Sequence, residues 1–165
     1  MDVLCVDMGN VIIDHVGFGT TVEFFNEGDY RDIPPVEDVL LYLKQLNEGR
    51  FKKNVFVVYN ATLVADSKID DWLAYHRFWE ITGITQDKVL RSKSGRNKLA
   101  FCIDNNVSHL IDDRLEVLGN LISFVSNLYL FRGQPEEINQ YSRFLPLVNK
   151  VNNWKEVSNL LNNDD

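Results

Sequence analysis

The chain has no long apolar run and no recognisable targeting signal. No stretch approaches the ~20 consecutive apolar residues that a membrane-spanning helix needs. The first residues, Met1 to Cys5, lack the basic region and the apolar core of a secretory signal peptide. We therefore expect a cytoplasmic protein that does not enter a membrane.

Cysteine is scarce, and neither copy lies in a metal-binding or redox pattern. The chain has two, Cys5 and Cys102, both inside apolar runs, without CxxC spacing or a histidine at metal-ligand spacing. A buried free cysteine behaves as a small apolar side chain. We expect two buried thiols, and neither a disulfide nor a thiolate metal site.

Basic residues are outnumbered by acidic ones. The chain has 17 Lys and Arg against 24 Asp and Glu, a formal net charge of −7 and a pI near 4.9. Non-specific nucleic-acid binding depends on clustered Lys and Arg, so this balance disfavours it. The one concentrated basic stretch contains Arg91, Lys93, Arg96 and Lys98. A local basic groove at that stretch stays open as an alternative.

What remains is an ordinary globular composition. The 165 residues are 45% hydrophobic and 25% charged, with a mean hydropathy of −0.19. At this length, folding buries roughly two-thirds of the surface of the unfolded chain, which is enough for one core. No internal repeat or linker is visible. We expect residues 1–165 to form a single domain.

Short apolar, β-branched runs alternate with helical periodicity along the chain. Near-continuous apolar strands separated by helices are typical of a parallel sheet covered on both faces. We therefore predict an α/β fold of three layers, with a doubly wound, Rossmann-like parallel sheet. The expected strands lie at 3–6, 55–59, 88–90, 109–111 and 128–131, and the expected helices at 36–47, 66–82, 98–105 and 115–125.

Carboxylates follow two of the expected strands. Asp7 comes directly after the first strand, and Asp112 and Asp113 follow the fourth. Ligands of open parallel sheets lie beyond the carboxyl ends of the strands, so the three side chains converge if these strands are adjacent. Like charges that close need a neutralising cation, and carboxylate oxygens suit Mg²⁺. In the alternative interpretation, these aspartates only cap the turns and helices that follow them.

The local sequences favour the functional interpretation. Residues 3–13, VLCVDMGNVII, resemble the first signature of the haloacid dehalogenase-like superfamily, whose Asp is a nucleophile. Residues 109–114, HLIDDR, resemble the fourth signature, an apolar strand that ends in Asp-Asp. Residues 55–61 and the helix after them stand in the place of the second signature, and Lys98 matches the third. The four-part order extends over most of the chain.

The resemblance implies a reaction and a fold. Asp7 would attack phosphorus and form an aspartyl-phosphate, which splits one displacement into two easier ones. Lys98 would neutralise Asp7 and a phosphate oxygen, with Lys93 as the alternative cation. The family's sheet has the order 3-2-1-4-5, which places the first strand at the centre. We expect a Mg²⁺-dependent phosphomonoester hydrolase.

The resemblance also implies a metal site and a substrate site. Mg²⁺ would be held by the Asp7 carboxylate, the Gly9 backbone carbonyl and Asp113, with Asp112 as a further ligand or an outer neighbour of the ion. Three residues at the second signature would contact the substrate, and they are Tyr59, Asn60 and Thr62. The side chain of Tyr59 is expected to project toward the bound phosphate.

The chain departs from the family pattern at two positions. Gly9 stands where most phosphatases of the superfamily carry the Asp that acts as general acid and base, although some sugar-phosphate phosphatases of the family share the Asp-x-Gly-Asn form. Tyr59 stands where a small hydroxyl residue normally binds phosphate. These departures leave a second hypothesis open, in which a catalytically degenerate domain binds a phosphorylated ligand or a partner protein.

The spacing of the elements leaves no room for a large cap. Family caps are insertions after the first or third strand. Residues 14–33 are enough only for a flap, and residues 62–98 are used by one helix, one short strand and a loop. We expect an open site that admits bulky phosphorylated substrates or is closed by a second copy of the chain.

Overall fold

The computed structural model describes residues 1–15, 29–60, 63–92 and 95–163. Helices and strands alternate along the chain, as the sequence pattern predicts. In chain order they are β1 (Leu4–Val6), η1 (Tyr30–Asp32), α2 (Val39–Glu48), β2 (Val55–Asn60), α3 (Leu63–Tyr75), α4 (Phe78–Thr82), η2 (Gln86–Lys88), β3 (Val89–Ser92), α5 (Gly95–Asp104), β4 (His109–Asp112), α6 (Leu115–Gly119), β5 (Asn127–Phe131), α7 (Pro135–Gln140), η3 (Ser142–Leu147), β6 (Asn149–Val151) and α8 (Trp154–Asn163).

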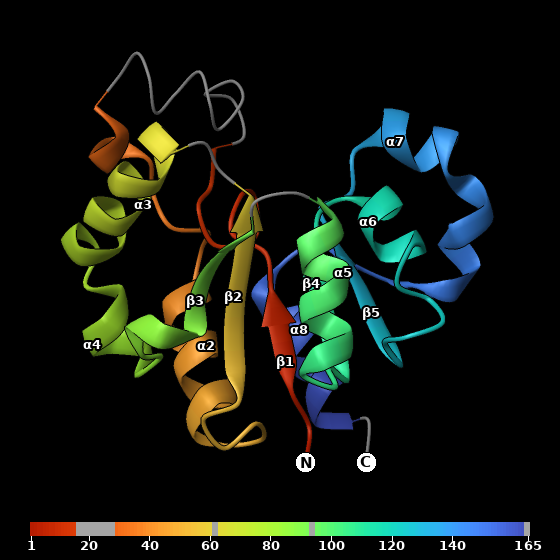
Figure 1. The fold of residues 1–165 in the computed structure, drawn as a ribbon, viewed down its shortest axis with the longest axis horizontal. Helices are drawn as coiled ribbons and strands as arrows, with labels where there is room; N and C mark the ends of the chain where they lie inside the picture. The colour runs from red at the N-terminus through yellow and green to blue at the C-terminus, as the bar shows by residue number, and fades with distance from the viewer. Residues whose placement is uncertain (16–28, 61–62, 93–94, 164–165) are drawn as a thin grey trace.

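The strands within these ranges form one parallel sheet in the order β3-β2-β1-β4-β5-β6. The predicted order of the first five is confirmed, and β6 adds an edge strand beside β5. Because all strands run in one direction, their carboxyl ends lie along the same edge of the sheet (Figure 1). β1 lies between β2 and β4, which places the residues after it near the middle of that edge.

Helices cover both faces of the sheet, so the predicted three-layer α/β architecture is confirmed. Figure 1 shows α5 in front of the sheet and α8 behind it. The core cluster behind the sheet includes Val39 and Leu43 of α2 and Leu161 of α8. The cluster in front includes Cys102 of α5 and Leu118 of α6. We refer to these as the α2 face and the α5 face.

Side-chain alternation along β1 decides where Asp7 points. Leu4 and Val6 belong to the core of the α2 face, whereas Cys5 belongs to the core of the α5 face. Successive side chains of a strand point to opposite faces, so Asp7 continues the direction of Cys5 toward α5. Cys5 and Cys102 are both buried free thiols, as predicted.

The helix predicted at 66–82 is two helices in the structure. α3 and α4 are separated by a turn in which Arg77 has φ of 56°. Trp72 of α3 and Phe78 of α4 are both fully buried in the core of the α2 face. In a continuous helix these two positions would be rotated by about 120° from each other. The turn lets both rings enter the same core. Gly83 ends α4 at φ of 67°, a left-handed cap that glycine adopts without a steric cost.

Two other expected boundaries are corrected, and one strand was not expected. α2 begins at Val39 and not at 36, because Pro35 pairs with Ile13 in an isolated bridge before the helix starts. α6 ends at Gly119, whose α-carbon lies against the Phe144 ring, so close that a β-carbon would fall 2.2 Å from it. β6 was not predicted, since two of its three residues are exposed and polar.

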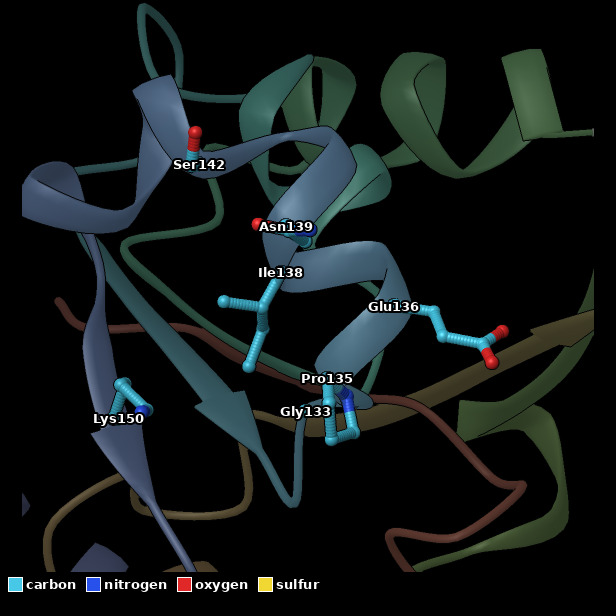
Figure 2. A pocket seen from close by; sticks show the side chains of 7 residues that line it. All are labelled: Gly133, Pro135, Glu136, Ile138, Asn139, Ser142 and Lys150. Carbon is cyan, nitrogen blue, oxygen red and sulfur yellow. The ribbon is translucent and has the colours of Figure 1, made fainter.

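No helix in the described ranges is long and apolar enough to cross a bilayer. A surface hollow of about 670 Å³ lies beside α7, η3 and β6 (Figure 2). Its polar side chains include one acid, Glu136, and one base, Lys150, and none of the three predicted site aspartates lines it. The full lining is Gly133, Pro135, Glu136, Ile138, Asn139, Ser142 and Lys150.

Candidate active site

The carboxyl ends of β1 and β4 hold the acidic residues that the sequence singles out. These strands are parallel neighbours, with Val6 paired to Ile111. The ladder continues one residue further, because the N–H of Asp7 donates to the carbonyl of Ile111 at 2.9 Å. Asp7 and Asp112 therefore emerge side by side from adjacent strands.

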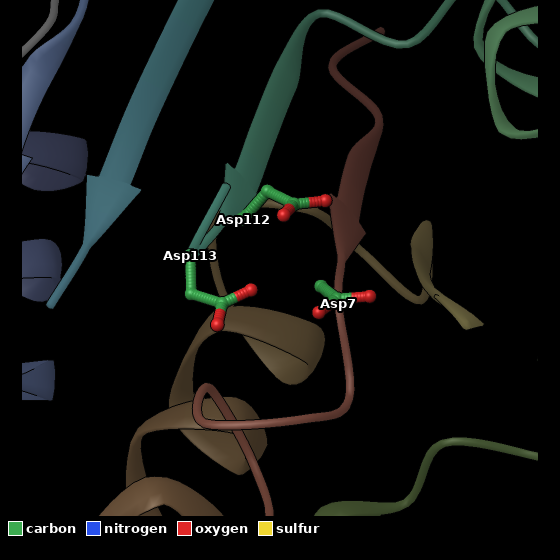
Figure 3. Close-up of side chains that lie close together, drawn as sticks. All are labelled: Asp7, Asp112 and Asp113. Carbon is green, nitrogen blue, oxygen red and sulfur yellow. The ribbon is translucent and has the colours of Figure 1, made fainter. Parts of the chain in front are cut away.

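Three carboxylates converge at this point. One oxygen from each of Asp7, Asp112 and Asp113 lies within 4.8 Å of the others. Figure 3 shows the three side chains at the ends of the two strands. Oxygens that share one Mg²⁺ at ~2.1 Å each lie at most ~4.2 Å apart, so only small side-chain movements separate this arrangement from a shared site.

Lys98 brings a positive charge to the cluster from α5. Its ammonium nitrogen lies 2.7 Å from Asp7 Oδ1 and 2.7 Å from Asp112 Oδ2, and its side chain is buried. Burial works against the charged form, but the two carboxylates outweigh burial and raise the pKa of Lys98 above its usual range. The ammonium group therefore remains charged and ties α5 to both strands.

Both carboxylate oxygens of Asp112 are bonded to protein groups. Oδ2 accepts a hydrogen bond from Lys98, and Oδ1 accepts one from the backbone N–H of Arg114 at 3.0 Å. The side chain is 1% exposed. Asp112 was expected to be either a further ligand of the ion or an outer neighbour of it. These contacts favour the second role, in which Asp112 orients Lys98.

Asp7 and Asp113 carry charge that the protein compensates only in part. Burial raises the pKa of Asp7 to about 6, with Lys98 opposing the shift. Burial, together with the charges of Asp7 and Asp112, raises the pKa of Asp113 to about 8. The raised pKa means that burial and the neighbouring carboxylates favour the protonated form of Asp113 when no cation is present. A divalent cation that displaced this proton would replace repulsion with ligation, as metal sites commonly do.

Oxygen atoms in the turn after Asp7 also fit a hard cation. No donor within the described ranges bonds to the Gly9 carbonyl. Asn10 donates from Nδ2 to Asp113 Oδ2 at 3.2 Å, while its buried Oδ1 has no hydrogen-bond partner in the part of the chain that the structure describes. Carboxylate and carbonyl oxygens with unmet charge and hydrogen-bonding capacity are what Mg²⁺ prefers. The residues present therefore fit the ion.

Tyr59 lies away from this site, which corrects the prediction that its side chain projects toward a bound phosphate. Val55, Val57 and Tyr59 of β2 share one side of the strand, and all three belong to the core of the α2 face. The tyrosine is 4% exposed. Lys98 lies on α5, which covers the opposite face. Strand alternation therefore directs Tyr59 into the core.

This placement reverses the expected effect of Tyr59→Ser. The substitution removes a buried ring, and large-to-small changes of this kind cost about 3 kcal/mol or more of unfolding free energy. We expect urea denaturation to show that loss, and phosphate release by the folded variant not to rise above the wild type. If the variant released phosphate faster than the wild type, Tyr59 would obstruct the substrate after all.

Asn60 is the other described residue predicted to contact substrate. It is exposed at the end of β2, where it pairs with Ser92 of β3. Alternation after Val58, a residue of the α5-face core, places it on the same face as Lys98. Asn60 stays a proposed substrate contact. Thr62 and Lys93 lie outside the described residues.

Solved structures of phosphatases share this architecture. A D,D-heptose 1,7-bisphosphate phosphatase from B. bronchiseptica, complexed with magnesium and phosphate, matches with a TM-score of 0.66 at 11% identity over 100% of both chains. The D,D-heptose 1,7-bisphosphate phosphatase from Burkholderia thailandensis gives 0.61 at 10% identity over 99% of this chain and 100% of that one. A protein described as a haloacid dehalogenase-like hydrolase, from Burkholderia xenovorans LB400, gives 0.63 at 14% identity over 99% and 96%.

The chain has a haloacid dehalogenase-like fold. No protein-family model and no curated protein matches its sequence. The resemblance drawn from residues 3–13 and 109–114 is thus confirmed at the level of the fold. The haloacid dehalogenase-like sheet order explains why Asp7 and Asp113 meet although 106 positions separate them in the sequence.

Asn10 is a site residue that the sequence pattern does not predict. In the structure, this residue contacts Asp113 from the turn after Asp7. The available signal was its position directly after Gly9, since asparagine tolerates the positive φ that tight turns need. Its φ is 59°.

Proposed function

We propose that this chain is a Mg²⁺-dependent phosphomonoester hydrolase that works through an aspartyl-phosphate on Asp7. One observation carries the proposal: Asp7, Asp112 and Asp113 lie within 4.8 Å of one another, with Lys98 2.7 Å from two of them. The phosphatase of the same fold from B. bronchiseptica was solved with magnesium and phosphate, which supports the choice of ion and substrate class.

The reaction proceeds in two displacements. An oxygen of the Asp7 carboxylate bonds to phosphorus, and the bond from phosphorus to the ester oxygen breaks, leaving its electron pair on the departing alkoxide. The alkoxide takes a proton from water. A water molecule then attacks the aspartyl-phosphate, which frees inorganic phosphate and restores the carboxylate. Lys98 remains charged beside Asp7 and orients it throughout.

The cation is held by oxygen atoms from both strands. Asp7, Asp113 and the Gly9 carbonyl are the proposed ligands, while Asp112 keeps Lys98 in place. When bound, Mg²⁺ supplies positive charge that offsets the repulsion between an anionic nucleophile and an anionic phosphate. Asn60 is the proposed contact to the substrate at the end of β2.

Gly9 directs the proposal toward particular substrates. Glycine offers no side chain to protonate the leaving oxygen, so the reaction depends on how stable the departing anion is by itself. Aryl phosphates and phosphates on an anomeric sugar oxygen leave as weaker bases than alkyl phosphates do. We expect the chain to prefer the first two classes.

Access to the site is also part of the proposal. The described residues between β2 and β3 form α3, α4 and η2, and no separate folded unit stands over Asp7 among them. The predicted flap within residues 14–33 lies largely outside the described residues. An open edge suits a bulky phosphorylated substrate, or closure by a second copy of the chain.

A second candidate function rests on the same glycine. Without a general acid at position 9, the chain can bind a phosphorylated ligand or partner and release no phosphate. The intact Asp7–Lys98 pair, 2.7 Å apart, favours turnover over this alternative.

Phosphate release from a panel of phosphomonoesters tests the proposal. The panel contains p-nitrophenyl phosphate, sugar 1-phosphates and sugar 6-phosphates, each assayed with Mg²⁺ and with excess EDTA. We expect release with Mg²⁺, fastest for the aryl and anomeric esters. EDTA should lower it by more than about 10²-fold, because a bound cation contributes several kcal/mol to the transition state.

The control variant is Asp104→Asn, which changes an exposed aspartate at the far end of α5. It should match the wild type on every ester. A wild-type chain that bound phosphate but released none from any ester would contradict the hydrolase and favour the degenerate domain. Release that EDTA left unchanged would contradict the metal site.

A further inference from the structure

Asn10 has three features that set it apart within the turn after Asp7. Its side chain is 8% exposed, and Nδ2 donates to Asp113 Oδ2 at 3.2 Å. Its Oδ1 is buried without a hydrogen-bond partner among the described residues. Its backbone lies in the left-handed region at φ of 59°. A polar atom in this state costs free energy unless something bonds to it.

The backbone alone does not require asparagine here. Glycine adopts a positive φ without strain, and asparagine tolerates it less well. The backbone therefore does not account for a buried amide with one polar end unmet, whereas a contact made by the side chain does. The contact that the structure shows is Asp113.

We propose that Asn10 is a positioning residue for the cation site: its amide N–H group holds Asp113 Oδ2, and its unpartnered oxygen accepts from water around the bound ion. This inference rests on the proposed function, because it presumes that Asp7 and Asp113 hold a cation. It adds Asn10 to the site. This residue lies on the turn between β1 and η1 and links the segment after Asp7 to Asp113.

The physical effect is on the geometry and the affinity of the cation site. The amide occupies one oxygen of Asp113 and leaves the other for the ion. Groups that orient a metal ligand through hydrogen bonds typically change metal affinity by 10- to 100-fold when they are removed. Mg²⁺ also keeps several waters, and these need acceptors in the protein.

Calorimetric Mg²⁺ titration of Asn10→Gly tests the proposal. Glycine keeps the positive φ and removes only the side chain, so the metal-free melting temperature should stay close to that of the wild type. The Kd for Mg²⁺ should rise by at least about tenfold. The Mg²⁺-induced rise in melting temperature, measured without substrate, should shrink in parallel.

The chain offers a matched control in Asn47. It is also a buried asparagine, with Nδ2 donating to the Thr82 carbonyl at 3.2 Å and with Oδ1 unpartnered among the described residues, but it lies on α2. Asn47→Ala should lower the metal-free melting temperature and leave the Kd for Mg²⁺ unchanged. If Asn10 had a purely structural role, Asn10→Gly would likewise lower the metal-free melting temperature and leave the Kd for Mg²⁺ unchanged.

A second variant covers the case in which Asn10→Gly does not fold. Asn10→Ser keeps a polar side chain but removes the amide that donates to Asp113 Oδ2. Its Kd for Mg²⁺ should also rise by at least about tenfold. If either variant folds and binds Mg²⁺ with the wild-type Kd, the inference about Asn10 is wrong, but the proposed function still stands. A wild-type chain that binds no Mg²⁺ overturns the proposed function as well.

Discussion

Asp7→Asn is expected to lower Mg²⁺-dependent phosphate release by on the order of 10⁴-fold or more, the range seen when a nucleophile is removed from an enzyme that works as a unit. The amide has nearly the same shape as the carboxylate, but its oxygen is too weak a nucleophile to displace an ester from phosphorus. The measurement is phosphate release on the best ester of the panel at saturating Mg²⁺.

The loss should occur without unfolding. Burial raises the pKa of Asp7 from 3.8 to about 6, so the native state favours the neutral form of this group. At neutral pH, the ionised carboxylate therefore lowers the free energy of unfolding, and a neutral amide avoids this effect. Lys98 lies 2.7 Å from Asp112 in the wild type, and we expect this contact to persist in the variant.

Circular dichroism and urea denaturation of Asp7→Asn provide the folding control, with Asp104→Asn as the matched Asp-to-Asn change on the surface. Activity within tenfold of the wild type, in a folded Asp7→Asn protein free of wild-type chain, would remove Asp7 as nucleophile. The remaining residues of the cation site would then have to serve a reaction that does not use Asp7 as nucleophile.

Lys98→Met is expected to have the largest effect on stability, a loss of about 3–5 kcal/mol of unfolding free energy. The ammonium group lies 2.7 Å from carboxylate oxygens of both Asp7 and Asp112, and the three side chains are all largely buried. Removing the cation leaves two carboxylates close together with their repulsion unopposed. Urea denaturation at neutral pH measures the loss, and Lys44→Met, at an exposed position on α2, is the control.

The deficit of Lys98→Met should depend on pH with a definite sign. Lys98 opposes the burial that raises the pKa of Asp7, so this pKa rises further without the ammonium group, and ionisation of Asp7 opposes folding more strongly. The deficit is then full above the raised native pKa of Asp7 and shrinks as pH falls through it. A second substitution, Asp112→Asn, should restore part of the stability at neutral pH.

Two outcomes would contradict this account of Lys98. A deficit below about 1 kcal/mol would show that the pair behaves as an exposed ion pair does. A deficit that grew as the pH was lowered would have the wrong sign for buried carboxylates. Either result would mean that Lys98 does not stabilise the fold by offsetting the charges of Asp7 and Asp112.

The prediction of Tyr59 failed for a physical reason that applies to parallel sheets in general. Strands buried on both faces are apolar at nearly every position, so the sequence of residues 55–60 does not tell which side chains face which layer. The face of Tyr59 depends on which positions of β2 pack against α2 and which against α5. That choice is made by packing partners far away in the sequence.

Element boundaries failed in a similar way. The break between α3 and α4 follows from the need to bury Trp72 and Phe78 in one core. α6 ends at Gly119, where the Phe144 ring leaves no room for a β-carbon. Neither feature is visible in the local periodicity. Existence and type of the main elements were predictable because long apolar and periodic segments carry their own signal.

The sequence by itself determined the α/β alternation, the thiol state of both cysteines and the segments that carry Asp7, Lys98, Asp112 and Asp113. These follow from local composition, from the rule that ligands lie at the carboxyl ends of parallel strands, and from a resemblance carried by short motifs. Only the tertiary structure decided which partner each carboxylate has. It bonds Asp112 to Lys98 and Arg114, directs Tyr59 into the core, and brings Asn10 to Asp113. The physical reason is distance: hydrogen bonds and burial depend on positions within a few ångströms, and residues about a hundred positions apart reach them only when the strands pair.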